Sequence, residues 1–258
     1  MPKRLRTTGQ GALPLRRLWA ILFWLLVWQL AAMAVGQRLL LASPAETLLR
    51  LIQLARTGAF WHSVLFTLEH ILAGFLCGVA AGALAAGFAA RFEVLRELFA
   101  PLLAAVKSVP VASFVIVALI WIPSRNLSVL ISFLITLPLI YTAVLDGLSG
   151  IDPKLREMAR VFHMSRRNRL LCIELPAVLP RLQSSAGVAM GLAWKSGVAA
   201  EVIGIPTGSI GERLYKAKVY LATPELFAWT LTIVLASMLC ERALRLCLRR
   251  AVRALERM

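Results

Sequence analysis

The residue types that most often catalyse reactions or bind metals are sparse in this 258-residue chain and do not cluster. Its four cysteines include no C-x-x-C pair and no spacing typical of a zinc site. His62 and His70 can share one helix face, but no third ligand accompanies them, and His163 lies far along the chain. No GxxxxGK[ST] sequence is present, so ATP binding by a P-loop is not expected. We therefore expect no metal, no cofactor and no enzymatic activity, and we rank a membrane-embedded enzyme last.

Two ionisable residues and a tryptophan stand inside the apolar stretch "GLAWKSGVAAEVIG". A lysine near the middle of a membrane span costs roughly 2.5–3.5 kcal/mol on insertion scales, so such residues often mark a transport pathway. Lys195 and Glu201 are separated by about 120° around a helix, which makes them an imperfect pair. Trp194, Lys195 and Glu201 are our candidates for a translocation pathway, in which Lys195 would favour an anionic solute. The alternative is a lysine held in a structural network.

The segment "REMARVFHMSRRNRLLCIELP", residues 156–176, is charged and amphipathic within an otherwise apolar chain. Asp152 and Pro153 suit the N-cap and first position of a helix just before it. The pattern predicts two short helices joined by a basic turn, the second ending at Pro176 and Pro180. Such a pair would form a compact knob. The alternative is a charged loop whose arginines contact anionic lipid.

The rest of the composition indicates a membrane protein. The chain is 59% hydrophobic, has a mean hydropathy of +0.76 and carries a net charge of +16. The basic residues lie in blocks between apolar runs, which argues against nucleic-acid binding and fits the positive-inside rule. Residues 32–34 resemble a small-residue cleavage site, so a cleaved signal peptide is the alternative for the N-terminal segment. The first apolar run is, however, long enough to span about 28 Å as a helix. We predict an all-α polytopic protein with six transmembrane helices at about 18–36, 63–88, 101–123, 126–145, 182–204 and 223–248.

Finer patterns suggest how these spans pack. Gly74, Gly78 and Gly82 recur on one face of the second span, which permits close helix contact. The third span contains three prolines, so we expect a kinked helix buried in the bundle. The fifth is rich in small residues and is expected in the interior. A capping box predicts a short helix at the membrane surface after Ser43, and a second capping box, Ser209 and Glu212, lies in a polar loop and amphipathic turn after the fifth span.

The distribution of Lys and Arg predicts the orientation. Twenty-one lie on the side of the two termini and seven on the other side, so both termini are expected in the cytoplasm. The chain then divides into a cytoplasmic basic segment at 1–17, a transmembrane domain at 18–248 that includes the cytoplasmic segment 152–180, and a cytoplasmic tail at 249–258.

The cytoplasmic segment resembles the EAA loop of ABC-importer permease subunits, whose pattern is Glu-Ala-Ala, three residues, Gly, nine residues, Ile, any residue, Leu-Pro. Five of its seven positions match here: Glu157, Ala159, Ile173, Leu175 and Pro176. Met158 replaces the first Ala and His163 replaces the Gly. Because His163 lacks the backbone freedom of Gly, the turn there must be right-handed or strained.

The resemblance extends along the chain. "TLEHILAGF" is similar to part of the second span of nitrate/sulfonate/taurine-class permeases, with His70 where Arg is usual, and "GLAWKSGVAAEVIG" is similar to the end of their fifth span. It implies a type I ABC importer permease-like fold in the bacterial inner membrane. The segment would be a coupling helix for ATPase subunits, in which Glu157 makes a polar contact and Ala159 allows close approach.

The implied partners are two ATP-binding cassette subunits, a second permease copy forming a homodimer, an extracytoplasmic solute-binding protein and the lipid bilayer. The substrate would be a small, anionic solute. A secondary transporter driven by an ion gradient is the alternative, although no convincing internal repeat supports it.

Overall fold

The computed structural model describes residues 13–37 and 39–255, and all regular structure within them is helical. The expected N-terminal segment and tail fall partly outside the described residues, at 1–12 and 256–258. A 3-10 turn precedes α6 and a π-helical turn precedes α9. In chain order the elements are α1 (Leu13–Val35), α2 (Pro44–Ala55), α3 (Gly58–Ala89), α4 (Glu93–Ser108), α5 (Val111–Ala118), the 3-10 turn (Ser124–Asn126), α6 (Leu127–Ser149), α7 (Pro153–Val161), α8 (Arg166–Arg169), the π turn (Leu170–Glu174), α9 (Leu175–Gly204), α10 (Ile210–Val219) and α11 (Thr223–Leu255).

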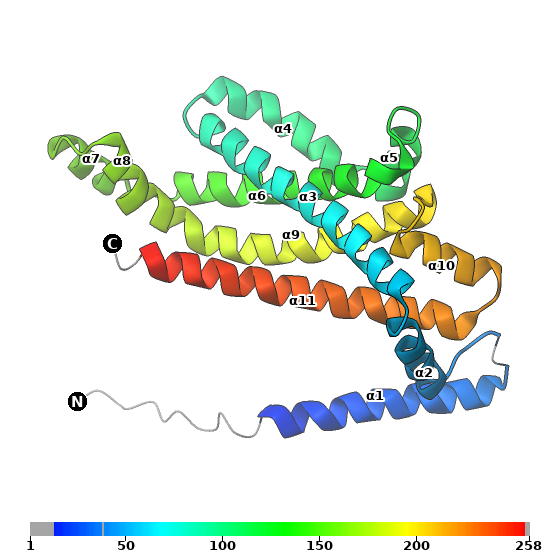
Figure 1. The fold of residues 1–258 in the computed structure, drawn as a ribbon. Helices are drawn as coiled ribbons and strands as arrows, with labels where there is room; N and C mark the ends of the chain where they lie inside the picture. The colour runs from blue at the N-terminus through cyan, green and yellow to red at the C-terminus, as the bar shows by residue number, and fades with distance from the viewer. Residues whose placement is uncertain (1–12, 38, 256–258) are drawn as a thin grey trace, which may run out of the picture.

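The centre of the molecule is made by α3, α6 and α9, with α6 packed against both of the others (Figure 1). Ile71 and Phe75 of α3, Ile140 of α6, and Met190 and Trp194 of α9 are buried together there. The expectation that the small-residue segment forms an interior helix is therefore confirmed. In a membrane bundle, this position also shields the more polar α9 from lipid.

The glycine stripe of α3 lies against α6, as its spacing predicts. A Cβ atom on Gly74 would stand 2.2 Å from the carbonyl oxygen of Val129, and one on Gly78 would stand 2.7 Å from the Cβ of Thr136. No larger residue fits at these positions unless the backbone moves. The glycines thus set the distance between the two helices.

The segment 101–123 differs from the expected single kinked span. α4 and α5 are two helices that meet at 101°, with the break at Val109 and Pro110. Proline disfavours the helical conformation in the residue before it, and Val109 has an extended ψ of 131°. The prediction that this segment is buried is also wrong for α4, because Leu103 is the one residue of that helix that is buried. Pro101, by contrast, lies inside α4 without breaking it.

Among the described residues, two helical segments are both long and apolar enough to cross a membrane: α3, and Ser124–Ser149, which contains α6. The bent α4–α5 pair would be a third if its two helices form one span. α9 and α11 have sufficient length, at 30 and 33 residues, but more polar composition. The apolar part of α1, Trp19–Val35, is shorter. The full set of six spans therefore stays a prediction.

The predicted helix after Ser43 is present as α2, and the expected amphipathic turn after Ser209 is a ten-residue helix, α10. The Ser43 hydroxyl accepts a hydrogen bond from the backbone N–H of Glu46, and the Glu46 carboxylate accepts one from the backbone N–H of Ser43. Together these bonds complete the capping box. At α10, Ser209 caps the backbone of Glu212 in the same way. The Glu212 carboxylate instead accepts from the Gly208 backbone, so this second box is only half formed.

Candidate functional site

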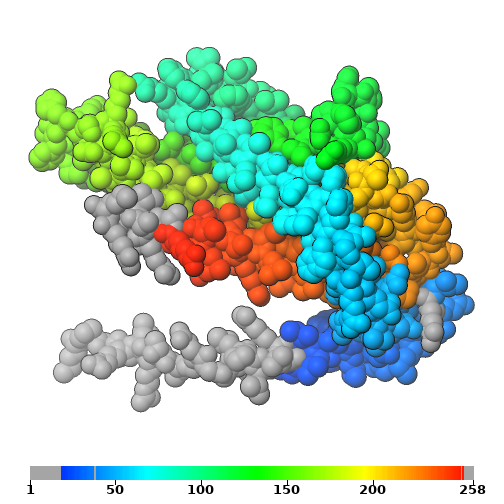
Figure 2. Space-filling view, viewed as in Figure 1, coloured from blue at the N-terminus to red at the C-terminus, as the bar shows by residue number. Residues whose placement is uncertain are grey.

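The segment 152–180 begins with the helix start that its sequence predicts. Asp152 accepts a hydrogen bond from the backbone of Lys154 at 2.9 Å, and Pro153 occupies the first helical position. α7 and α8 then project from one end of the bundle (Figures 1 and 2). This placement leaves α7 accessible to another protein.

α7 ends in a Schellman motif, in which His163 adopts a left-handed conformation with φ of 46°. The backbone N–H of His163 donates to the carbonyl of Arg160, and that of Met164 donates to the carbonyl of Ala159. This is the position at which the EAA pattern has Gly, the residue that adopts positive φ without strain. Of the two expected alternatives, the strained turn is the one observed.

The exposed surface of α7 combines apolar and charged side chains. Leu155, Met158 and Phe162 follow one another at helical spacing and are 43, 45 and 74% exposed. Glu157 is exposed beside them. Ala159, in contrast, is 4% exposed, so it faces the interior of this chain.

The second half of the segment is helical throughout, which corrects the expectation that its helix ends at Pro176 and Pro180. The π turn at Leu170–Glu174 joins α8 to α9 without interruption. Pro176 lies in the first turn of α9, where backbone N–H groups make no intrahelical hydrogen bond, so the N–H that proline lacks is not needed. Pro180 lies further along within the same helix. The second half of the segment and the expected fifth span therefore form one continuous helical stretch.

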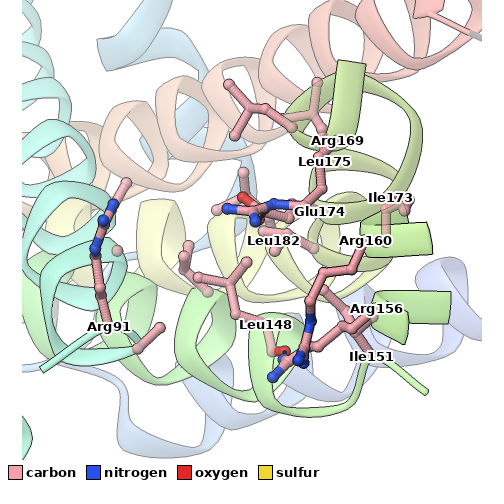
Figure 3. A pocket seen from close by; sticks show the side chains of 16 residues that line it. Arg91, Leu148, Ile151, Arg156, Arg160, Arg169, Ile173, Glu174, Leu175 and Leu182 are labelled. Carbon is pink, nitrogen blue, oxygen red and sulfur yellow. Dashed lines mark hydrogen bonds and ion pairs between the residues drawn. The ribbon is translucent and has the colours of Figure 1, made fainter. Parts of the chain in front are cut away.

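Ile173 and Leu175 lie partly buried in a cavity of about 710 Å³ behind α7 (Figure 3). The cavity walls come from the ends of α3 and α6 and from the segment running from α7 into α9. Its residues are mostly apolar, together with four arginines and one glutamate: Ala83, Gly87, Ala90, Arg91, Val144, Leu148, Ile151, Arg156, Arg160, Arg169, Leu170, Ile173, Glu174, Leu175, Val178 and Leu182.

Lys195 lies on a different side of α9 from the other two pathway candidates, Trp194 and Glu201. Trp194 is 1% exposed within the core, and Glu201 is fully buried. Lys195 is exposed, and it makes no hydrogen bond or ion pair with the residues that the structure describes. The structure thus separates Lys195 from the other two residues.

Glu201 belongs to a polar network near the end of α9. Its Oε2 atom accepts hydrogen bonds from Thr67 Oγ1 of α3 at 2.8 Å and from the backbone N–H of Gly211 at 3.3 Å. Thr67 Oγ1 in turn accepts from the backbone of Ile210 at 3.0 Å. The carboxylate therefore lies at the N-terminus of α10, where the unpaired N–H groups favour a negative charge.

Thr67 and the N-terminus of α10 were not recognised as partners of Glu201 in the sequence. A usable signal was present, because Ser63 and Thr67 are polar residues four apart on the buried face of α3. Buried polar side chains require hydrogen-bond partners, which the apolar neighbours cannot supply. The identity of those partners depends on residues more than a hundred positions away.

On the outer side of α10, the charge of Glu212 is balanced locally. Burial acts to raise the pKa of this carboxyl group, but hydrogen bonds from the Lys216 ammonium and the Gly208 N–H outweigh it. The charges of Lys216 and Arg213 act in the same direction, so the pKa lies below its ordinary value. Glu212 is therefore ionised at neutral pH and keeps the turn at Gly208 attached to α10.

Comparison with known proteins identifies the class of this helical bundle. Residues 78–257 match the family described as the binding-protein-dependent transport system inner membrane component. An ABC transporter permease protein of Brucella abortus is 26% identical over 218 residues, covering 84% of this chain and 87% of the relative. The taurine transport system permease protein TauC of Escherichia coli is 24% identical and covers 86% and 83%.

Two further matches agree with this class. The protein named as an aliphatic sulfonates transport permease, SsuC of Bacillus subtilis, is 25% identical over 85% of this chain and 80% of the relative. A crystal structure of a bacterial ABC transporter involved in import of the acidic polysaccharide alginate contains a similar chain, with a TM-score of 0.62 at 15% identity, covering 93% of this chain and 98% of that one. That likeness concerns the fold.

The chain belongs to the family of inner-membrane permease components of binding-protein-dependent ABC importers. It is a membrane-embedded, multi-pass transport subunit. Membership of such a system implies an ATPase and a solute-binding protein as partners.

Proposed function

We propose that this chain forms the translocation pathway of an ATP-driven importer for a small anionic solute of the nitrate, sulfonate or taurine type. Two copies would surround the pathway, two ATPase subunits would bind at α7, and a binding protein would deliver the solute at the opposite end. The names of the relatives SsuC and TauC support this solute class.

The observation that carries the coupling role is the exposed surface of α7. Leu155, Met158 and Phe162 present apolar area to solvent at the tip of a projecting helix, which is costly unless a partner covers it. Glu157 adds a charged group that would orient the contact. Since α8, the π turn and α9 are continuous, a displacement of this knob would be carried directly into the bundle.

Ala159 would act from inside the knob. Its burial means that a larger side chain would push α7 away from the structure behind it. Substitution there would therefore alter the position of the apolar surface, whereas substitution of Glu157 would alter the surface itself.

The pathway role of Lys195 is supported by an uncovered stripe on α9. Val188, Leu192, Lys195 and Ala199 are exposed at intervals of four, three and four residues on α9, a helix whose other face is buried in the core. We propose that this stripe faces the second copy across the pathway, where Lys195 gives a positive potential that favours an anion. Trp194 and Glu201 would then support the pathway from the interior of each subunit.

The delivery side would lie at the opposite end of the bundle from α7 (Figure 1). Val219 at the end of α10 and the next two residues, Tyr220 and Leu221, are 56, 78 and 63% exposed. A contiguous exposed apolar patch of this kind is typical of a protein contact. We propose that the binding protein docks there.

The coupling proposal is tested by reversing one charge. With the ATPase subunits co-expressed, Glu157→Lys should reduce ATPase co-purification and solute uptake by about tenfold, because each charge-reversed contact at an interface costs on the order of 1–3 kcal/mol. Glu97→Lys on the exposed face of α4 makes the same charge change outside the knob and should behave as wild type. Normal co-purification of ATPase with Glu157→Lys would refute the contact.

Uptake by the lone chain with an ion gradient would refute the ATP-driven mechanism itself.

A further inference from the structure

The cavity behind α7 has the properties of a ligand site that neither the coupling contact nor the pathway uses. Its volume of about 710 Å³ lies within the range of small-molecule sites, about 300–1,000 Å³. It is bounded by the same ends of α3 and α6 that would reach the membrane surface.

Its charge is strongly one-sided. Arg169 pairs with Glu174 at 2.9 Å, and Arg156 donates to the carbonyl oxygen of Leu148 at 2.5 Å. The guanidinium groups of Arg91 and Arg160 make no ion pair or hydrogen bond with any residue that the structure describes, and that of Arg91 lies 6.0 Å from the centre of the Phe92 ring. Figure 3 shows Arg91 reaching the cavity from the α3 side and the other arginines from the opposite wall. Two guanidinium groups are thus available to an anion, and each can bind phosphate oxygens through two parallel N–H donors.

The remaining wall is apolar and extends toward the membrane interior along α3, α6 and α9. Ala83, Val144, Val178 and Leu182 supply this part of the surface. A free inorganic anion would leave it uncovered, whereas an acyl chain would cover it. Basic pockets between membrane helices on the cytoplasmic side are known to bind the headgroups of anionic lipids.

We propose that this cavity binds an anionic phospholipid, with its headgroup between Arg91 and Arg160 and part of an acyl chain against the apolar wall. The lipid would connect the ends of α3 and α6 to the segment that runs from α7 into α9. It would thereby hold the knob in a defined orientation relative to the bundle. The site is independent of the proposed solute and of ATPase docking.

The test measures lipid binding to the purified full-length chain, with any subunits that co-purify, by native mass spectrometry. Phosphatidylglycerol and phosphatidylcholine with identical acyl chains are titrated separately, and inorganic phosphate is then added as a competitor. Phosphatidylglycerol should bind at least about tenfold more tightly than phosphatidylcholine, because only the former has a net negative charge.

Two pairs of variants locate the site. The double variant Arg91→Gln, Arg160→Gln should weaken phosphatidylglycerol binding by about 30-fold, because each basic residue contributes roughly 1 kcal/mol to the attraction of an anionic lipid. Arg249→Gln with Arg250→Gln removes the same charge from exposed positions near the end of α11 and should leave binding within about twofold of wild type. Gly87→Leu should fill the cavity, because a Cβ there meets no atom within 4 Å, and Gly87→Ala is its conservative control.

Loss of lipid in the first arginine pair and in Gly87→Leu, with both controls unaffected, supports the proposal. Equal losses in the two arginine pairs would show general electrostatic attraction and would overturn it. Displacement of the lipid by millimolar inorganic phosphate, or unchanged binding in Gly87→Leu, would show a free-anion site instead. The elution profile of each variant in detergent establishes that it is folded.

Discussion

At the scale of single residues, similar side chains have acquired different roles through their surroundings. Glu201 is enclosed by hydrogen-bond donors from α3 and α10, while Glu157 is exposed on α7. Lys195 is exposed on α9 without a partner among the described residues, whereas Lys216 is paired with Glu212 at 2.6 Å. Side chains of the same type therefore differ in burial and in bonding partners, which residue type alone does not specify.

Lys195→Met should lower uptake of an anionic solute by about tenfold, since it removes one positive charge from the proposed pathway. Dimer assembly and basal ATPase activity should be unchanged, because the side chain makes no bond within the described structure. Transport and assembly are measured together in proteoliposomes and by light scattering. Lys107→Met, at an exposed position near the end of α4, serves as the control. Collapse of expression, or unchanged transport, would assign Lys195 a structural role.

His163→Gly should stabilise the end of α7 by about 1 kcal/mol, because it relieves the left-handed strain of a residue with a Cβ atom. Slower hydrogen exchange of the amides at His163 and Met164 would show this, since both close the Schellman motif. Met164→Gly, one residue further, should instead accelerate exchange. Faster exchange in His163→Gly would mean that the imidazole stabilises the turn in another way.

At the scale of elements, helix positions depend on a few close contacts. The α3–α6 distance depends on three glycines, whereas Gly87 on the same helix faces open space. Gly78→Leu should therefore cost about 3 kcal/mol or more and abolish the monodisperse peak in size-exclusion chromatography. Gly87→Leu is the matched substitution and should elute normally. If both variants elute normally, the two helices are free to separate.

The connection between α8 and α9 shows how an element can absorb prolines. A π turn places Pro176 at the start of α9, and the helix continues past Pro180. The opposite outcome occurs at Pro110, where the chain bends by 101° between α4 and α5. Pro176 lies in a first helical turn, where proline is tolerated, whereas Val109, directly before Pro110, has left the helical conformation.

At the scale of the whole molecule, the arrangement places α7 and α8 at one end of the bundle and α10 at the other (Figure 1). With the basic residues concentrated on the side of α7, we predict that this end is cytoplasmic. Cysteines introduced beside Arg125 and Lys218 should be labelled by an impermeant reagent from outside in intact cells. Cysteines beside Arg167 and Arg250 should be labelled only after the membrane is opened. The reverse pattern would contradict both the orientation and the coupling role of α7.

The sequence alone determined the features that depend on residues a few positions apart. The caps at Ser43 and Asp152 and the glycine face of α3 follow from local hydrogen bonding or backbone sterics, which at His163 left a right-handed or a strained turn as alternatives. The helical class and the family also follow from patterns along the chain, because hydropathy and the EAA spacing are properties of sequence.

The tertiary structure decided which distant residues meet. Glu201 bonds to Thr67 across 134 positions, and the cavity joins Arg91 after α3 to Arg160 on α7. The burial of Ala159, the exposure of Lys195 and the angle between α4 and α5 likewise depend on how the helices pack. No local rule specifies these contacts, because the free energy that selects them comes from burying helix faces against one another, and many pairings of apolar faces satisfy the same sequence pattern.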